Sequence, residues 1–398
     1  MNNIRNEFGV YDQKDAPIYF DSAATSLTPK IVLEKVQEYY NTYPANIHRG
    51  IYKLSQKATE EFESVRTKVQ KFLNAKSDQE IVFTKGSTEA LNLLATTLGE
   101  SLHPGDEIIL SGMEHHANII PWTLLKEKKG IILKIIPVLE NGTLDIGAYK
   151  KLLSPKVKIV SIMHVSNVLG TINPIKEIFQ LAHDNNSITI CDGSQAVMHM
   201  PVDVQDLGAD FYVFTGHKLF GPTGVGVLYG KYELLNNLPP YQGGGDMITS
   251  VSFDHVEYKE APYKFEAGTP NIAGVIGLGA AIDWIQNIGW KEIMKHEELL
   301  QNKLLETLKH LPFIQILALN APRISLVSIL IPGIHPHDIG TVLDNENICV
   351  RTGHHCAEPL MKTLNVPATT RISLSLYNTL EEIENLKSAL EKTYLLLK

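Results

Sequence analysis

The sequence predicts an α/β protein built on a mainly parallel β-sheet that helices cover on both faces. Short runs rich in β-branched residues alternate with helical patterns along most of the chain. These strand-like runs are continuously apolar, which is typical of parallel strands buried on both faces. The chain has 398 residues, of which 44% are hydrophobic and 20% charged, so it is long enough for two domains and apolar enough for a large core.

The first half of the chain carries the alternating pattern. Helices are expected at residues 31–43 and 60–73, before the first strand. The expected strands are residues 81–84, 107–110, 132–138, 158–163, 187–191 and 211–214. Further helices are expected from residue 87, after residues 115–118 and at residues 175–185. The Gly-Pro-Thr-Gly segment at residues 221–224 predicts a tight turn that brings the chain back.

Near residue 284 the pattern changes, which predicts a second, smaller α/β domain. The expected helices there are residues 291–310, 336–344 and 380–397, and the expected strands are residues 324–331, 348–351 and 371–376. We therefore predict a large domain at residues 15–287 and a small domain made of residues 1–14 and 288–398.

Composition and charge exclude several classes of protein. The formal net charge of -8 argues against a nucleic-acid-binding protein, which usually carries a basic face. No run of eighteen apolar residues predicts a transmembrane helix, and the polar N-terminus does not resemble a secretory signal. The three cysteines are too few for a disulfide framework, and we expect a reduced cytoplasmic protein. Cys191 and Cys349 lie in apolar strand patterns and are expected to be inert core thiols.

Reactive side chains follow the carboxyl ends of five predicted strands. They lie in residues 85–89, 114–118, 164–167, 192–195 and 215–218. Ligands of open α/β sheets bind in the crevice outside the carboxyl ends of the strands. The five motifs are therefore expected to meet in one crevice.

Three of these motifs offer complementary chemistry. Gly86, Ser87 and Thr88 open a helix and could seat an anion, although a simple helix cap is the alternative. Asp192 could pair with a protonated ring nitrogen of a cofactor, or could be a turn aspartate. Lys218, 26 residues later, could be a desolvated amine nucleophile or a lysine extending to the surface.

The two histidines of the motif at residues 114–118 indicate a function less specifically. His115 and His116 could be polar residues at a helix start. One of the two imidazoles could also stack on a flat cofactor ring or shuttle protons.

The segment at residues 351–361 carries the third cysteine. Two histidines, His354 and His355, if protonated, and Arg351 would favour the thiolate of Cys356 and so its attack as a nucleophile. A metal site made of His354, His355 and Cys356 is an alternative. Consecutive residues diverge in direction, however, and no second Cys/His pair follows at zinc-finger spacing. We therefore predict no metal.

Together these motifs resemble a known family. The chain is similar nearly end to end to the class-V, fold-type-I pyridoxal 5′-phosphate (PLP) enzymes, and within them to the SufS-type (group II) cysteine desulfurases. The motifs that carry the resemblance are residues 20–24, 46–50, 114–118, 164–167, 192–195, 215–224, 264–270 and 351–361. One departure is Lys264, where the family typically has arginine. The resemblance implies a mainly parallel seven-stranded sheet in the large domain.

The resemblance also implies a role for each site residue. Lys218 would hold PLP covalently, Asp192 would pair with its ring nitrogen, and His115 would stack on its ring. The other expected cofactor contacts are Gln195 and Asn167 near the phenolic oxygen, Ser87, Thr88, Thr215 and His217 at the phosphate, and Thr269 from the second subunit of a homodimer. The expected substrate contacts are Arg371 as the carboxylate clamp, with Arg351, Asn167 and His48.

The implied activity is conversion of L-cysteine to L-alanine, with the sulfur held as a persulfide on Cys356. A SufU- or SufE-type acceptor protein would take this sulfur for iron–sulfur cluster assembly, and His337 resembles a position used with SufU-type acceptors. A helix-start histidine is the alternative for His337. The alternative activities are selenocysteine lyase and another PLP-dependent lyase or aminotransferase of the same fold.

Overall fold

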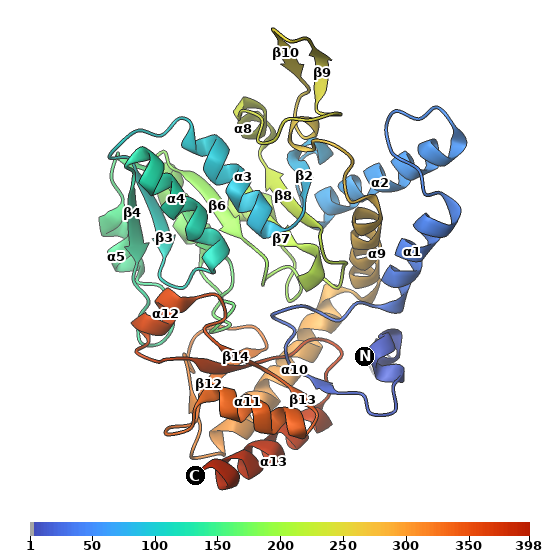
Figure 1. Cartoon of the computed structure of the whole chain (residues 1–398). Coiled ribbons are helices and arrows are strands. Elements are labelled where there is room, and N and C mark those ends of the chain that lie inside the picture. The colour runs from blue at the N-terminus through green and yellow to red at the C-terminus, as the bar shows by residue number, and fades with distance from the viewer. Residues whose placement is uncertain (1–3) are drawn as a thin grey trace.

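A seven-stranded sheet forms the centre of the computed structural model within residues 4–398, the part of the chain that it describes (Figure 1). The strands, in spatial order, are β2 (Ile81–Thr84), β8 (Gly226–Gly230), β7 (Phe211–Thr215), β6 (Ile188–Asp192), β5 (Val157–Met163), β3 (Glu107–Ser111) and β4 (Ile132–Ile136). β8 runs antiparallel to both neighbours, and the other pairs are parallel. The predicted mainly parallel seven-stranded sheet is therefore confirmed.

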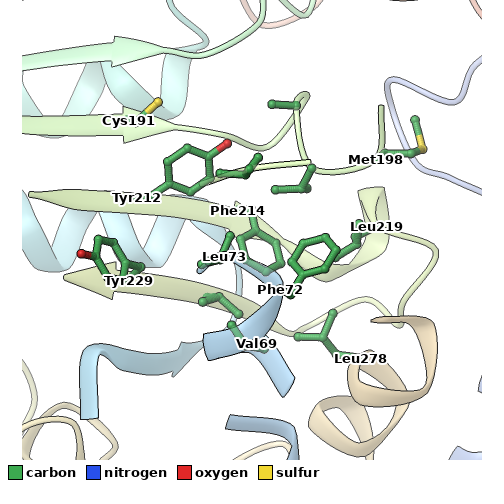
Figure 2. Close-up of a cluster of buried hydrophobic side chains, with 14 of the residues drawn as sticks. Val69, Phe72, Leu73, Cys191, Met198, Tyr212, Phe214, Leu219, Tyr229 and Leu278 are labelled. Carbon is green, nitrogen blue, oxygen red and sulfur yellow. The ribbon is translucent and has the colours of Figure 1, made fainter. Parts of the chain in front are cut away.

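Helices bury both faces of this sheet. In β7, Phe211 and Val213 pack into the cluster that contains residues of α3 (Ser87–Gly99) and α4 (Ile120–Lys129). The alternate residues Tyr212 and Phe214 pack into a second cluster with residues of α2 (Lys53–Phe72), α6 (Ile175–Asp184) and α9 (Ile272–Ile288). Figure 2 shows Phe214 beside Phe72 in this second cluster. Burial on both faces explains why the strand sequences are continuously apolar.

Helix α9 is the largest element that the sequence pattern did not predict. It packs against α1 (Lys30–Thr42) and α2, and most of its residues are buried. A helix that is apolar on all sides has no amphipathic period, so the sequence of α9 does not indicate a helix. Other elements that were not predicted include α5 (Ile146–Leu152), α7 (Val204–Leu207), α8 (Tyr232–Asn237), β8 and the hairpin of β9 (Ile248–Val251) and β10 (Val256–Tyr258), which projects at the top of Figure 1.

The C-terminal part of the chain is built on a four-stranded antiparallel sheet. Its strands, in order, are β11 (Gln315–Ile316), β12 (Leu326–Leu330), β15 (Thr369–Ser373) and β14 (Arg351–Gly353). A separate apolar cluster joins it to α10 (Trp290–Lys309), α11 (Pro336–Asn345) and α13 (Leu380–Leu397). The chain bends by 80° between α9 and α10, close to the predicted domain junction. The domain limits themselves stay a prediction, and residues 1–3 of the predicted small domain lie outside the described residues.

Two predicted strands differ from the structure. The strand expected at residues 348–351 is wrong as a single element, because β13 (Ile348–Cys349) pairs with β1 (Ile18–Tyr19) whereas β14 pairs with β15. The strand expected at residues 371–376 ends at Ser373, and a turn follows in which Asn378 Oδ1 accepts from the Ser375 amide. Among residues 4–398, no single helix is both long and apolar enough to span a membrane, and α9 and α10 meet the two conditions only together, as a pair bent by 80°.

Candidate active site

The five motifs meet at one cavity beyond the carboxyl ends of the parallel strands. The cavity has a volume of about 690 Å³. Its lining includes Gly86, Ser87, Thr88, His115, Asn167, Thr215, His217, Lys218, Arg351, His355 and Arg371. A small adjoining pocket shares Ser87, His115, Asn167 and Lys218 with this cavity and adds Asp192 and Gln195. The expected convergence of residues from β2, β3, β5, β6 and β7 is therefore present.

Lys218 lies in the 3-10 turn that follows β7 directly (Gly216–Lys218). The hydroxyls of Thr25 and Ser26 both donate to the His217 carbonyl, at 3.1 and 3.0 Å, and so fix this turn. Burial lowers the pKa of Lys218 to about 8; Asp192 opposes this shift, and the nearby arginines reinforce it. A larger fraction of the amine is therefore neutral, and nucleophilic, near neutral pH.

Asp192 is the last residue of β6 and is buried. Its Oδ1 accepts a hydrogen bond of 3.0 Å from the Ser194 amide, which fixes the carboxylate at the floor of the small pocket. The Asp192 charge also acts on Lys218. Asp192 is therefore placed to balance a positive charge in this pocket.

His115 shares both cavities with Lys218. Its Nδ1 accepts a hydrogen bond of 3.1 Å from the Ala117 amide, so the proton of the neutral ring is on Nε2. Burial, followed by the Lys218 charge, lowers the pKa of His115 to about 4. The ring is therefore neutral and has a defined tautomer at physiological pH.

An anion cradle lies at the start of α3. The residue at the N-cap is Gly86, so the expected alternative of a plain cap by Ser87 or Thr88 is wrong. β8 passes so close that a Cβ on Gly226 would lie 2.4 Å from the Gly86 Cα. Backbone amides and the positive end of the helix dipole favour a phosphate at such a site. Thr215 and His217 complete this side of the cavity, and burial lowers the pKa of His217 to about 4.

Arg371 is a fully buried cation on β15. It donates to Asp21 Oδ1 at 2.8 Å and to the Asn167 carbonyl at 2.9 Å. Within the described part of the chain, Arg371 Nε and Asn167 Oδ1 are buried without a hydrogen-bond partner. Buried polar atoms normally have partners, so these two indicate a polar ligand beside them. Gln195, whose Nε2 donates to the Ala23 carbonyl at 2.7 Å, lies in the adjoining pocket.

The loop that carries Cys356 borders the cavity through Arg351 and His355, and Cys356 itself is not among the lining residues. Arg351 Nη2 is 3.9 Å from the Cys356 sulfur, and the Cys356 charge acts on Lys218. The expected contribution of a protonated His355 is wrong. Burial and two arginines lower the pKa of His355 to about 3, and its Nε2 lies 2.8 Å from Thr369 Oγ1. Among residues 4–398 no group of His, Cys, Asp or Glu side chains is placed to hold a metal ion.

Three predicted residues lie away from this cavity. His48 lies between Glu63 Oε1 and Asp246 Oδ2, at 2.8 and 2.9 Å from its two ring nitrogens. Thr269 lines a neighbouring pocket of about 290 Å³. His337 lies in the first turn of α11, where its amide donates to His335 Nδ1 at 3.2 Å. Their assigned roles stay predictions.

Two contributions were not assigned from the sequence. Asp21 holds Arg371, and the pair Thr25 and Ser26 supports the Lys218 turn. Asp21 belongs to the motif at residues 20–24, and Thr25 and Ser26 follow it directly, so this motif was the available signal. Lys264, the departure from the family pattern, donates its buried Nζ to the Asn236 carbonyl at 2.7 Å, away from the cavity.

Comparisons with known proteins agree with this geometry. Residues 18–386 match the aminotransferase class-V family. A probable cysteine desulfurase of Halalkalibacterium halodurans is 49% identical over 396 residues, which cover 98% of this chain and 97% of that protein. The apo structure of the cysteine desulfurase from Thermococcus onnurineus NA1 has a TM-score of 0.94 and 41% identity, with 98% of this chain and 97% of that chain covered.

A more distant structure is a C-DES mutant with glycine covalently linked to its PLP cofactor. Its TM-score is 0.85 at 25% identity, with 97% of this chain and 98% of that chain covered. By sequence and by fold, the chain therefore belongs to the aminotransferase class-V family and, within it, to the cysteine desulfurases.

Proposed function

We propose that this chain takes the sulfur from L-cysteine, releases L-alanine, and holds the sulfur as a persulfide on Cys356 for transfer to an acceptor protein. The observation that carries this proposal is an amine and a carboxylate in adjoining pockets, from Lys218 and Asp192, with the thiol of Cys356 on a bordering loop. The residue before it on that loop, His355, lines the cavity, and the Cys356 charge acts on Lys218. The relatives named as cysteine desulfurases support the same reaction.

The residues of the cavity fit pyridoxal 5′-phosphate, the cofactor of this family. The start of α3 suits its phosphate, Asp192 suits its ring nitrogen, and the neutral ring of His115 suits a stacking contact. Asn167 Oδ1, buried without a partner among the described residues, would be available to accept a hydrogen bond from a donor on the bound cofactor or substrate. When bound, PLP supplies an electron sink next to the substrate α-carbon.

The chain's own residues supply binding and proton transfer. Arg371 presents a buried guanidinium to the substrate carboxylate, and its Nε is available for this bond. Lys218, whose amine is partly neutral, accepts the proton from the substrate α-carbon. Arg351 stabilises the thiolate of Cys356.

Sulfur transfer then occurs at Cys356. The thiolate attacks the substrate sulfur, a sulfur–sulfur bond forms, and the carbon–sulfur bond breaks. The electron pair of that bond stays with the carbon, which takes up a proton to give alanine. The cysteine persulfide is a reversible state, so the sulfur can be passed on.

The finer assignments belong to the same proposal. We infer a SufS-type enzyme that works as a cytoplasmic homodimer, receives Thr269 from its second subunit, and supplies iron–sulfur cluster assembly through a SufU- or SufE-type acceptor. The position of Thr269 outside the cavity of its own chain supports a contact with another subunit. His48 and His337 are the remaining candidates for substrate and acceptor contacts.

The test is incubation of the PLP-loaded protein with L-cysteine, measuring alanine and protein-bound persulfide. We expect Cys356→Ala to abolish persulfide formation and to lower alanine release by at least about tenfold, because the variant lacks the nucleophile. Cys349→Ala is the matched control, since Cys349 is a second half-buried free thiol and lies on β13 rather than on the Cys356 loop. Alanine and persulfide formed by Cys356→Ala at the wild-type rate would contradict the role of this thiol.

The two alternative activities are separated by product and substrate. An aminotransferase would need no thiol, so its activity would survive Cys356→Ala. A selenocysteine lyase would turn over L-selenocysteine much faster than L-cysteine in the same assay.

A further inference from the structure

The loop that carries Cys356 has a strained backbone. His355 and Cys356 have φ values of 53° and 56°, so two consecutive residues with side chains adopt the left-handed conformation. Each such residue costs free energy relative to the right-handed or extended regions. The conformation therefore persists only where surrounding contacts hold it.

Three hydrogen bonds from residues beyond the large-sheet strands hold this loop. The His116 amide donates to the Cys356 carbonyl at 2.7 Å, and Asn167 Nδ2 donates to the His355 carbonyl at 2.7 Å. The Glu358 amide donates to His116 Nε2 at 3.1 Å. His116 therefore contacts the loop twice, at Cys356 through its backbone and at Glu358 through its ring.

The hydrogen bond to the His116 ring gives a partner to a backbone amide at the start of a helix. Glu358 is the first residue of α12 (Glu358–Thr363), and amides in the first turn of a helix have no partner within the helix. Because Nε2 accepts this bond, the proton of the His116 ring is on Nδ1. The neighbouring His115 has the opposite tautomer and lines the cavity, whereas His116 is not among the described lining residues.

We propose that His116 is a positioning residue for sulfur transfer, whose ring holds the start of α12 and thereby keeps Cys356 beside Arg351 at the cavity. This inference deepens the proposed function and rests on it. The sulfur lies 3.9 Å from Arg351 Nη2 only while the loop keeps its left-handed turn. Loss of the ring acceptor lets the turn relax and moves the thiol away from that charge.

The variants isolate the ring, because the backbone bond to Cys356 is unchanged in all of them. His116→Phe keeps a ring of similar size and removes the acceptor. His116→Gln keeps an acceptor at a similar reach. His116→Leu repeats the loss with a smaller side chain if the Phe variant fails to fold. Cofactor absorbance and melting temperature identify the variants that have folded and loaded PLP.

Two readouts on the PLP-loaded protein test the proposal. We expect His116→Phe to slow single-turnover persulfide formation roughly tenfold, the effect of one net hydrogen bond, with little change in the L-cysteine KM. We also expect the rate of alkylation of Cys356 by iodoacetamide at a fixed pH to change in this variant, because the thiol no longer keeps its place beside Arg351. His116→Gln is expected to restore both values towards wild type.

The outcomes distinguish this inference from the proposed function. Wild-type rates of persulfide formation and an unchanged alkylation rate in His116→Phe, or an equal loss in His116→Gln, overturn the positioning role of the ring. Failure of the wild-type protein to form persulfide would instead sink the proposed function itself.

Discussion

Glu114 is a fully buried carboxyl group directly before His115. It accepts hydrogen bonds from Asn118 Nδ2 at 2.7 Å and from the Met163 amide at 2.9 Å. The group thereby connects the loop after β3 with the end of β5, and both segments carry residues of the active site. Burial, assisted slightly by the Asp192 charge, raises the pKa of Glu114 to about 7.

This shift predicts a pH-dependent stability. The folded-state pKa lies above the value of the unfolded chain, so the stabilising effect of the protonated group is complete at low pH and is lost as pH rises through about 7. We expect the free energy of unfolding to fall by on the order of 3 kcal/mol more in wild type than in Glu114→Gln between pH 5 and 8.5. Urea denaturation at several pH values measures the difference. The same pH dependence in both proteins would show that Glu114 does not titrate in this range.

Individual site residues differ in how far the sequence predicts them. Lys218 and Asp192 follow strands whose apolar runs are unambiguous, so their positions at the crevice follow from the sheet. The neutrality of His355 could not be predicted, because it depends on burial and on the nearby charges of Arg371 and Arg351, which only the folded chain shows. Asp21 and Ser26 show the same limit, since hydrogen bonds between distant segments leave no local pattern.

Helices and strands, like single residues, are predicted where a local sequence pattern is present. Strand β2 and helix α13 have the predicted limits, because one has a short apolar run and the other a Thr379 capping box followed by an amphipathic pattern. Strand β8 was not predicted; glycines stand at both its ends, Gly226 and Gly230, and glycine is depleted in strands. The glycines are there because neighbouring segments leave no room for side chains.

One prediction at the scale of secondary-structure elements concerns Gly226, the first residue of β8. A Cβ at this position would lie between 2.4 and 2.8 Å from the Gly86 backbone, so Gly226→Ala must displace the start of α3. We expect this variant to lose about 1–3 kcal/mol of stability and to hold PLP at least several-fold less tightly. Thermal denaturation and titration of the apoprotein with PLP measure both effects. Gly243→Ala is the control, since its Cβ meets nothing within 4 Å. Equal PLP affinity in both variants would contradict the cradle assigned to α3.

At the scale of the whole molecule, the active site depends on how the C-terminal segment packs on the large sheet. Arg351, Cys356 and Arg371 come from that segment, while Lys218 and Asp192 come from the large sheet. The sequence predicts each half of this arrangement. The placement of the C-terminal segment relative to the large sheet depends on buried contacts between the two. The residues that make these contacts show no periodic pattern in the sequence.

His199 and Glu297 form one such contact. His199 follows β6, Glu297 lies on α10, and their side chains are both buried with Nδ1 and Oε2 2.7 Å apart. Removal of one partner leaves the other polar group buried alone, whereas replacing both by apolar groups avoids this penalty. We therefore expect His199→Leu to cost about 3–5 kcal/mol, and His199→Leu with Glu297→Leu to recover most of that loss. A double-mutant cycle by chemical denaturation measures the coupling. Additive losses would mean that this pair does not hold α10 against the large sheet.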